Sequence, residues 1–512
     1  MQISQRKAGI ILSYVTIVLN VVVAFVYVPV FLHYMGQSEF GLYNLMGSLI
    51  AYFSILDFGL PATIVRYYSK YKALNDEKSM ENILALCFRI YLVITVVLVT
   101  AGIVLYFFLD SFFGNSLTPA ELVSAKKIYI VFLINVSITV PVQIFNAVLM
   151  SYERFAFLKL LTLGQVVLQP FVIIAMLRMY PTALSLVSVQ TLFNLLAAIW
   201  RVYYCFAKLK IKIKMHYFDK ELFFGLLRFS FFICLNVIAD QILWRSNQLI
   251  LGVVATTAVV AIYAIAFQIS YNYSTLSTVV SGVFLPRVTE MVTQDASRRQ
   301  LSDLFITVGR LQFLLLSCVM TGFIVFGRPF IALWAGAGFE QAYLMTLLLI
   351  IPFTVEFIQN LGFTILQAQN KFAFKVKLFL AIALINIVLA VPAAKRFGGV
   401  GCAAVTGITF FIGNVIMNVY YSGAIGLDIK RFWLAILKMA IPSALCCLFG
   451  FSLKAFSLPS AIVDLGVKII IYLAVYALAM WLFAMNDYEK NLVRGPVSKS
   501  AFAAKKIFLR SK

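Results

Sequence analysis

Hydrophobic segments long enough to cross a membrane recur along almost the whole of this chain. A helix needs about 20 apolar residues to cross the ~30 Å hydrocarbon core of a bilayer, and fourteen segments of about that length can be read in the 512 residues. Strands of a membrane β-barrel would be about 10 residues long with alternating hydrophobicity, and the sequence shows no such pattern. We therefore predict an all-α polytopic membrane protein with about 14 transmembrane helices. The predicted spans are 8–32, 40–65, 82–109, 128–150, 157–178, 182–206, 223–252, 256–286, 304–327, 341–366, 376–394, 398–422, 432–453 and 461–486.

The composition agrees with a chain that lies mostly in the bilayer. It is 62% hydrophobic and 12% charged, whereas soluble domains carry about 25% charged residues. The seven cysteines all lie in apolar segments and form no CxxC pair. We expect them to pack as small apolar residues rather than to bind a metal or form disulfides. No cofactor is expected.

Lysines and arginines are distributed unevenly between the two sides of the predicted membrane. If the N-terminus is inside, 32 of the 42 lie in inner segments or at inner helix ends and seven lie outside. The positive-inside rule then predicts that both termini are cytoplasmic. The net charge of +22 follows from this topology. Since no soluble basic domain is present, nucleic acid is not an expected partner.

The second set of six segments resembles the first. Residues 147–157 (AVLMSYERFAF) match residues 364–374 (TILQAQNKFAF), and both follow the fourth span of their set. Copies six helices apart keep the same orientation, so we predict two six-helix lobes related by a parallel pseudo-two-fold repeat. The predicted division is an N-terminal lobe at 1–206, a basic cytoplasmic linker at 207–222, a C-terminal lobe at 223–422, and two additional helices with a basic tail at 423–512.

The predicted linker alternates lysines with apolar residues from Lys208 to Lys214. This period of two gives one cationic and one apolar face. We expect the cationic face to lie on the anionic headgroups of the inner leaflet. An alternative is that it gathers anionic lipid for transport.

Several polar side chains fall inside the predicted spans. Charged groups at Asp57, Asp240, Arg245 and Glu356 each cost about 2.5–3.5 kcal/mol at a helix centre on insertion scales, so we expect them to face an interior cavity. Amides and tyrosines form helical stripes, which either bond helices together or bind substrate. The candidates from these stripes are Asn146, Gln241, Asn247, Tyr271, Asn272, Gln359 and Asn360.

Four segments of the chain resemble bacterial polysaccharide flippases of the Wzx type (O-antigen, capsule or teichoic type). This branch belongs to the superfamily that also holds multidrug (MATE) exporters and the lipid II flippase. Members often have a second glycine where this chain has Pro61. The segments are 56–68 (LDFGLPATIVRYY), 151–155 (SYERF), 240–263, which begins DQILW and ends AIY, and 284–287 (FLPR).

The resemblance implies a flippase rather than an enzyme. The implied substrate is a polyprenyl-diphosphate-linked oligosaccharide, moved from the inner to the outer leaflet of the bacterial cytoplasmic membrane for surface polysaccharide biosynthesis such as lipopolysaccharide. The implied mechanism is alternating access of two lobes around a central cavity. Expected partners are membrane lipids, anionic inner-leaflet headgroups, and polysaccharide polymerase or ligase machinery.

Chemistry assigns roles to the candidate residues under this hypothesis. A diphosphate prefers a cationic site, for which Arg245, with Arg66 and Arg89 nearer the entrance, is the candidate. The sugar suits amides and tyrosines such as Asn146, Gln241, Tyr271 and Asn272. The acids Asp57, Asp240 and Glu356 either pair with arginines or bind a coupling cation, Na⁺ or H⁺.

Three alternative functions stay open. A MATE-like exporter of small cationic compounds would require a more acidic cavity. The predicted spans of this chain instead contain both acidic and basic residues. An integral-membrane enzyme that modifies glycans would want a sizeable loop with paired carboxylates or a histidine, and the outer loops near 110–127 and 328–340 hold no histidine. A lipid scramblase without coupling differs from a flippase only in transport assays.

Overall fold

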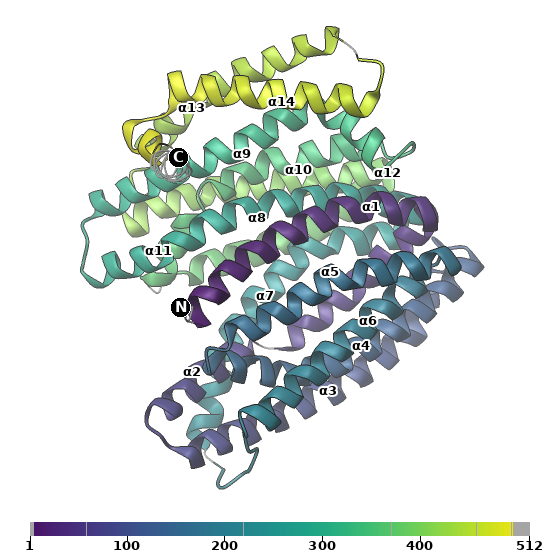
Figure 1. The fold of residues 1–512 in the computed structure, drawn as a ribbon, viewed down its shortest axis with the longest axis vertical. Helices are drawn as coiled ribbons and strands as arrows, with labels where there is room; N and C mark the ends of the chain where they lie inside the picture. Colours follow the sequence, from purple (N-terminus) through teal and green to yellow (C-terminus); the bar gives the residue numbers. More distant parts are fainter. Residues whose placement is uncertain are drawn as a thin grey trace, which may run out of the picture. The chain divides into compact units, whose positions relative to one another are not determined.

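The computed structural model describes residues 5–57, 59–218, 220–369, 371–456, 458–492 and 494, and these are mostly helical (Figure 1). The helices of the first half are α1 (Gln5–Ala51), α2 (Leu60–Ala73), α3 (Glu77–Phe113), α4 (Pro119–Ser151), α5 (Phe155–Met179), α6 (Ala183–Tyr203) and α7 (Lys220–Val254). Those of the second half are α8 (Thr257–Thr293), α9 (Arg298–Trp334), α10 (Gln341–Phe357), α11 (Asn360–Ala368), α12 (Ala373–Tyr420), α13 (Ile429–Ser452) and α14 (Ala461–Ala479). Short 3₁₀ or π segments are η1 (Tyr52–Asp57), η2 (Tyr204–Lys208), η3 (Tyr421–Ile425), η4 (Leu453–Ala455) and η5 (Met480–Ala484).

Many of these helices are long and apolar enough to cross a membrane. Among the described residues eight meet this criterion, and α10 with α11 forms a further candidate span. The prediction of an all-α, multi-pass membrane protein is therefore confirmed. The number of fourteen spans, the parallel repeat and the lobe boundaries stay predictions.

Two helices contain turns at glycines. Gly36 in α1 has φ 74° and ψ 179°, and Gly398 in α12 has φ 56° and ψ −139°. Glycine adopts positive φ without the steric cost that a Cβ atom brings. Each turn falls where the sequence predicts one span to end and the next to begin, between 32 and 40 and between 394 and 398.

Two predicted spans are interrupted part-way along their length. The span at 40–65 passes from α1 through the 3₁₀ segment η1 to Gly59, which is left-handed with φ 65°, before α2 begins. The span at 341–366 is bent by 42° between α10 and α11. Proline lies near both breaks, with Pro61 at the start of α2 and Pro352 inside α10. The first interruption begins at Tyr52, nine residues before Pro61.

The chain forms two compact units: Met1–Ile265 with Phe379–Val405, and Ala266–Leu378 with Thr406–Lys512. In the first unit, α3 packs on α4, and α4 and α5 both pack on α6 (Figure 1). In the second unit, α9 packs on α10, α13 and α14. Each unit therefore buries apolar faces between long neighbouring helices.

The basic linker is attached to the beginning of α3 in the first unit. The side-chain oxygen of Asn82 accepts hydrogen bonds from the backbone N–H groups of His216 (3.0 Å) and Tyr217 (3.2 Å). Lys210 and Lys212 are exposed, whereas Ile211 between them is buried. The alternation read from the sequence thus separates a cationic from an apolar side, as predicted, and the lipid contact stays a prediction.

Polar contacts tie the C-terminal helices to α9 in the second unit. Arg310 of α9 forms two hydrogen bonds with the carboxylate of Glu489, at 2.6 and 2.9 Å, and donates to the Ala484 carbonyl. The Glu489 side chain is fully buried and that of Arg310 is 10% exposed. Further along α9, Thr321 bonds to Tyr472 of α14 at 2.6 Å. These contacts fix α14 and the segment after it against α9.

We predict that Arg310→Met destabilises the protein strongly, because it leaves the Glu489 carboxylate buried without its partner. Removing one member of a buried ion pair costs about 3–5 kcal/mol. The matched control is Arg431→Met, because the Arg431–Asp303 pair is 53% and 47% exposed and exposed pairs contribute about 0–1 kcal/mol. Thermal unfolding of the detergent-solubilised protein measures both, and equal shifts would contradict the prediction.

Candidate substrate-binding site

A run of polar residues on α7 contacts three neighbouring segments of the first unit. Consecutive residues of a helix lie about 100° apart, so Ser246, Asn247 and Gln248 reach different partners. The Ser246 hydroxyl bonds to Tyr52 of η1 at 2.9 Å, and Asn247 donates to the Tyr263 hydroxyl of α8 at 2.9 Å. Gln248 accepts from Ser48 of α1. All three α7 side chains are buried.

Arg245 directly precedes Ser246, the first residue of this run, and interacts electrostatically with two tyrosines. It is half-buried, and its charge acts on the hydroxyls of Tyr43 and Tyr52. Gln190 of α6 donates to the Tyr43 hydroxyl at 2.9 Å. A guanidinium carries five N–H donors in a planar fork that matches phosphate oxygens. The structure therefore places a cation with this geometry among hydroxyl and amide groups within the helical bundle.

The broken span beside Arg245 adds to this site. Tyr52 begins η1, and the chain then passes Gly59 before it enters α2. Interrupted helices within membrane proteins are tolerated where protein or a water-filled cavity surrounds them, and transporters use such interruptions as binding sites. The candidate Asp57 is the last residue of η1, and its side chain lies outside the described residues.

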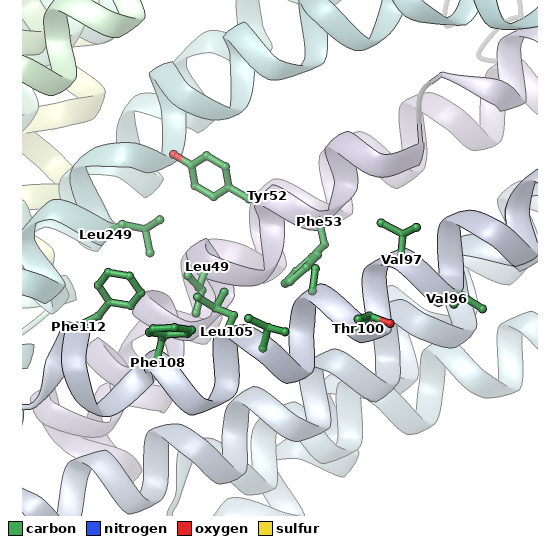
Figure 2. A pocket seen from close by; sticks show the side chains of 12 residues that line it. Leu49, Tyr52, Phe53, Val96, Val97, Thr100, Leu105, Phe108, Phe112 and Leu249 are labelled. Atoms are coloured by element: carbon green, nitrogen blue, oxygen red, sulfur yellow. The ribbon is translucent and has the colours of Figure 1, made fainter.

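A groove of apolar residues runs along α3 in the first unit and is called the α3 groove below. Its volume is about 860 Å³. Figure 2 shows α3 side chains on one side, Leu49 and Phe53 facing them, and the Tyr52 hydroxyl pointing away from the phenylalanines. Its lining residues are Leu49, Tyr52, Phe53, Val96, Val97, Thr100, Ala101, Val104, Leu105, Phe108, Phe112 and Leu249.

The second unit has a polar cluster at the break between α10 and α11. Gln359, which is buried, donates to Asn418 of α12 at 2.7 Å, and Asn418 also accepts from Trp433 at 3.1 Å. Asn360 donates to Ser281 of α8 at 3.1 Å. The two predicted amides thus bond helices together, which is one of the two roles that the sequence left open.

Glu356 forms an ion pair in this cluster. Its carboxylate lies 3.1 Å from the Lys375 ammonium at the start of α12, and the two side chains are 20% and 16% exposed. From the sequence we expected an arginine or a coupling cation beside Glu356, and the structure instead places Lys375 there. The ammonium also lies 4.3 Å from the centre of the Phe363 ring.

The other candidates lie elsewhere on their helices. Arg66 and Arg89 are exposed on α2 and α3, and Arg66 lies 5.7 Å from the centre of the Tyr67 ring. Asp240 is exposed and Gln241 half-buried on α7. Asn146 donates to Gln143 at 3.4 Å, Tyr271 stacks on Phe267, and Asn272 is half-buried. Their roles in binding stay predictions.

Comparisons with known proteins agree with this architecture. The family described as "Polysaccharide biosynthesis protein" matches residues 7–292, more than half of the chain. The chain belongs to this family. The resemblance to polysaccharide flippases is thereby confirmed at the level of the family. No curated protein matches the chain.

Solved structures show the same fold at low sequence identity. The lipid II flippase MurJ, in an inward closed conformation, has a TM-score of 0.73 and 16% identity, over 93% of this chain and 98% of MurJ. An inward-facing MATE-family multidrug resistance transporter of the MOP superfamily has a TM-score of 0.67 and 13% identity, over 81% and 96% of the two chains. A MOP superfamily transporter from Pyrococcus furiosus has a TM-score of 0.55 and 15% identity, over 83% and 97%. The likeness to these structures shows that the chain shares the fold of a lipid II flippase and of MOP superfamily transporters.

We predict that Glu356 acts through its ion pair with Lys375. Glu356→Gln and Lys375→Gln each leave a half-buried charge without its partner, which we expect to cost about 1–3 kcal/mol. The exchanged variant, Glu356→Lys with Lys375→Glu, restores the attraction and should recover most of the lost stability and transport. Thermal unfolding and transport are measured together, and recovered stability without recovered transport would show that Glu356 itself contacts cargo or a coupling ion.

Proposed function

We propose that this protein is a flippase that moves a polyprenyl-diphosphate-linked oligosaccharide from the inner to the outer leaflet of the bacterial cytoplasmic membrane. Membership of the polysaccharide biosynthesis family and a fold like that of the lipid II flippase support a lipid-linked substrate. The observation that carries the proposal is Arg245, a half-buried cation one residue before Ser246, whose hydroxyl bonds to Tyr52 of the interrupted span at 2.9 Å.

The chemistry of this region suits an anionic headgroup. Arg245 would bind the diphosphate through charge-assisted hydrogen bonds, which are about twice as strong as neutral ones. The exposed Arg66 and Arg89 would attract the substrate from the cytoplasmic leaflet. Amides and tyrosines such as Gln241, Asn146 and Tyr271 would bind the sugars.

Transport would follow alternating access, in which the N- and C-terminal lobes rock and expose the site to one leaflet at a time. Both termini would be cytoplasmic. The carboxylates of Asp57 and Asp240 remain candidates for a coupling cation, Na⁺ or H⁺. The delivered glycan would pass to a polymerase or ligase at the outer face.

We predict that Arg245→Gln lowers the transport rate about 10- to 100-fold at limiting substrate, because a hydrogen bond to a charged group contributes about 1.5–3 kcal/mol. Arg245→Lys keeps the positive charge but lacks the planar set of guanidinium donors. Its transport rate should lie between those of the wild-type protein and Arg245→Gln. The assay uses liposomes with a polyprenyl-diphosphate oligosaccharide and an external glycosidase that cannot cross the bilayer.

Arg178→Gln is the matched control, because Arg178 lies in the last turn of α5, which the proposed topology puts at the outer face, and bonds to Tyr34. Wild-type rates in Arg245→Gln would place the diphosphate elsewhere. No glycan exposure by the wild-type protein, together with export of a cationic dye under an ion gradient, would replace the proposal with the MATE-like alternative.

A further inference from the structure

The α3 groove has the length and chemistry of a site for a hydrocarbon chain. Its α3 wall contains Val96, Thr100, Val104, Phe108 and Phe112, which repeat at intervals of four residues and share one helix face. From Val96 to Phe112 this wall measures about 24 Å at 1.5 Å per residue, which is most of the ~30 Å hydrocarbon core. None of the described residues that line the groove is charged.

The groove is continuous with the cation on α7. Leu249 lines the groove, and Arg245 is four residues earlier on the same face of α7. Tyr52 connects the two regions as well, because its ring lines the groove while its hydroxyl bonds to Ser246 at 2.9 Å. An amphiphile with its chain in the groove would thus have its head one helical turn from Arg245.

The distance of Arg245 from the end of α7 favours the transported lipid over an ordinary phospholipid. Arg245 lies nine residues before the end of α7 at Val254, or about 14 Å along the helix axis. The phosphate of a bilayer phospholipid stays at the membrane surface, outside the hydrocarbon core. Only a lipid whose anionic head moves through the protein would use the cation and the groove at the same time.

We propose that the α3 groove binds the polyprenyl chain of the substrate while its diphosphate lies at Arg245. This inference rests on the proposed function and adds a binding site for the apolar part of the cargo. The volume of about 860 Å³ is within the range of about 300–1,000 Å³ that is usual for ligand pockets. The groove would bind the chain while Arg245 binds the head, so that both parts of the lipid are bound before the protein changes conformation.

The test uses a polyprenyl diphosphate with a photoreactive benzophenone on its chain, added to the protein in liposomes. After illumination, mass spectrometry identifies the labelled peptides. We expect labelling within residues 96–112 of α3, and at least fivefold less labelling when excess unlabelled polyprenyl diphosphate is present. An absence of α3 labelling would overturn the inference, as would equal competition by phosphatidylglycerol.

Two adjacent positions of α3 provide matched variants. Val104→Trp fills the groove, whereas Ile103→Trp adds the same bulk to a residue that does not line it. Val104 and Ile103 are 51% and 49% exposed. We expect Val104→Trp to lower α3 labelling and glycan exposure at least fivefold and Ile103→Trp to change both less than twofold. Equal effects of the two variants, with equal thermal stability, would overturn the inference.

The labelling does not require transport, so the two proposals can fail separately. Glycan exposure by the wild-type protein without α3 labelling would overturn the proposed chain site and support the proposed flippase function. Labelling of α3 that Val104→Trp abolishes, without glycan exposure, would support the chain site and overturn the proposed function.

Discussion

The absence of water from the hydrocarbon core determines most of this structure. Every backbone N–H and C=O group there must find a partner inside the protein, which long helices provide along their own axes. Polar side chains face the same requirement, and several of them bond across helices, as Ser48 does with Gln248 and Gln359 does with Asn418. These residues therefore lie in clusters where several helices meet.

The two interrupted spans are the places where the chain departs from this rule. A 3₁₀ segment followed by a left-handed glycine, and a bend of 42° between α10 and α11, leave backbone groups without their usual helical partners. Each interruption lies beside a polar cluster, around Tyr52 and Ser246 in one unit and around Gln359 and Asn418 in the other. Transporters use broken helices with polar neighbours for binding. We therefore expect substrate or ion binding at the two interrupted spans.

Local features of this fold were predictable from the sequence, and contacts between distant residues were not. Hydrophobic length predicts the helices, and the turns at Gly36 and Gly398 lie where polar or small residues separate two spans. Tyr52–Asp57 consists mainly of apolar residues and reads as ordinary helix, so its 3₁₀ conformation was not foreseen.

The charged residues themselves were predictable from the sequence, but their partners were not. Hydropathy identified Glu356 as a costly charge that needs compensation, but its partner, Lys375, follows a second helix and a turn. Only the three-dimensional path of the chain brings the two together. Likewise, the sequence singled out Arg245, whereas its electrostatic interaction with Tyr43 and Tyr52 depends on how α7 packs against α1 and η1.

The chemistry of a lipid-linked cargo explains why a cation and an apolar groove would occur side by side. The hydrocarbon chain of such a lipid is already soluble in the bilayer core. The protein therefore needs to keep only the charged and sugar-bearing head from contact with hydrocarbon. A fully enclosed pocket would have to surround the chain as well. The helices around it would lose contacts with one another, and their polar groups would lose contact with water. An apolar wall with exposed residues such as Val96 and Phe108 leaves the chain in contact with lipid, while Arg245 compensates the charge of the head. A small soluble cation has no chain to accommodate and would gain nothing from this pairing, which is why the arrangement favours an anionic lipid as the cargo.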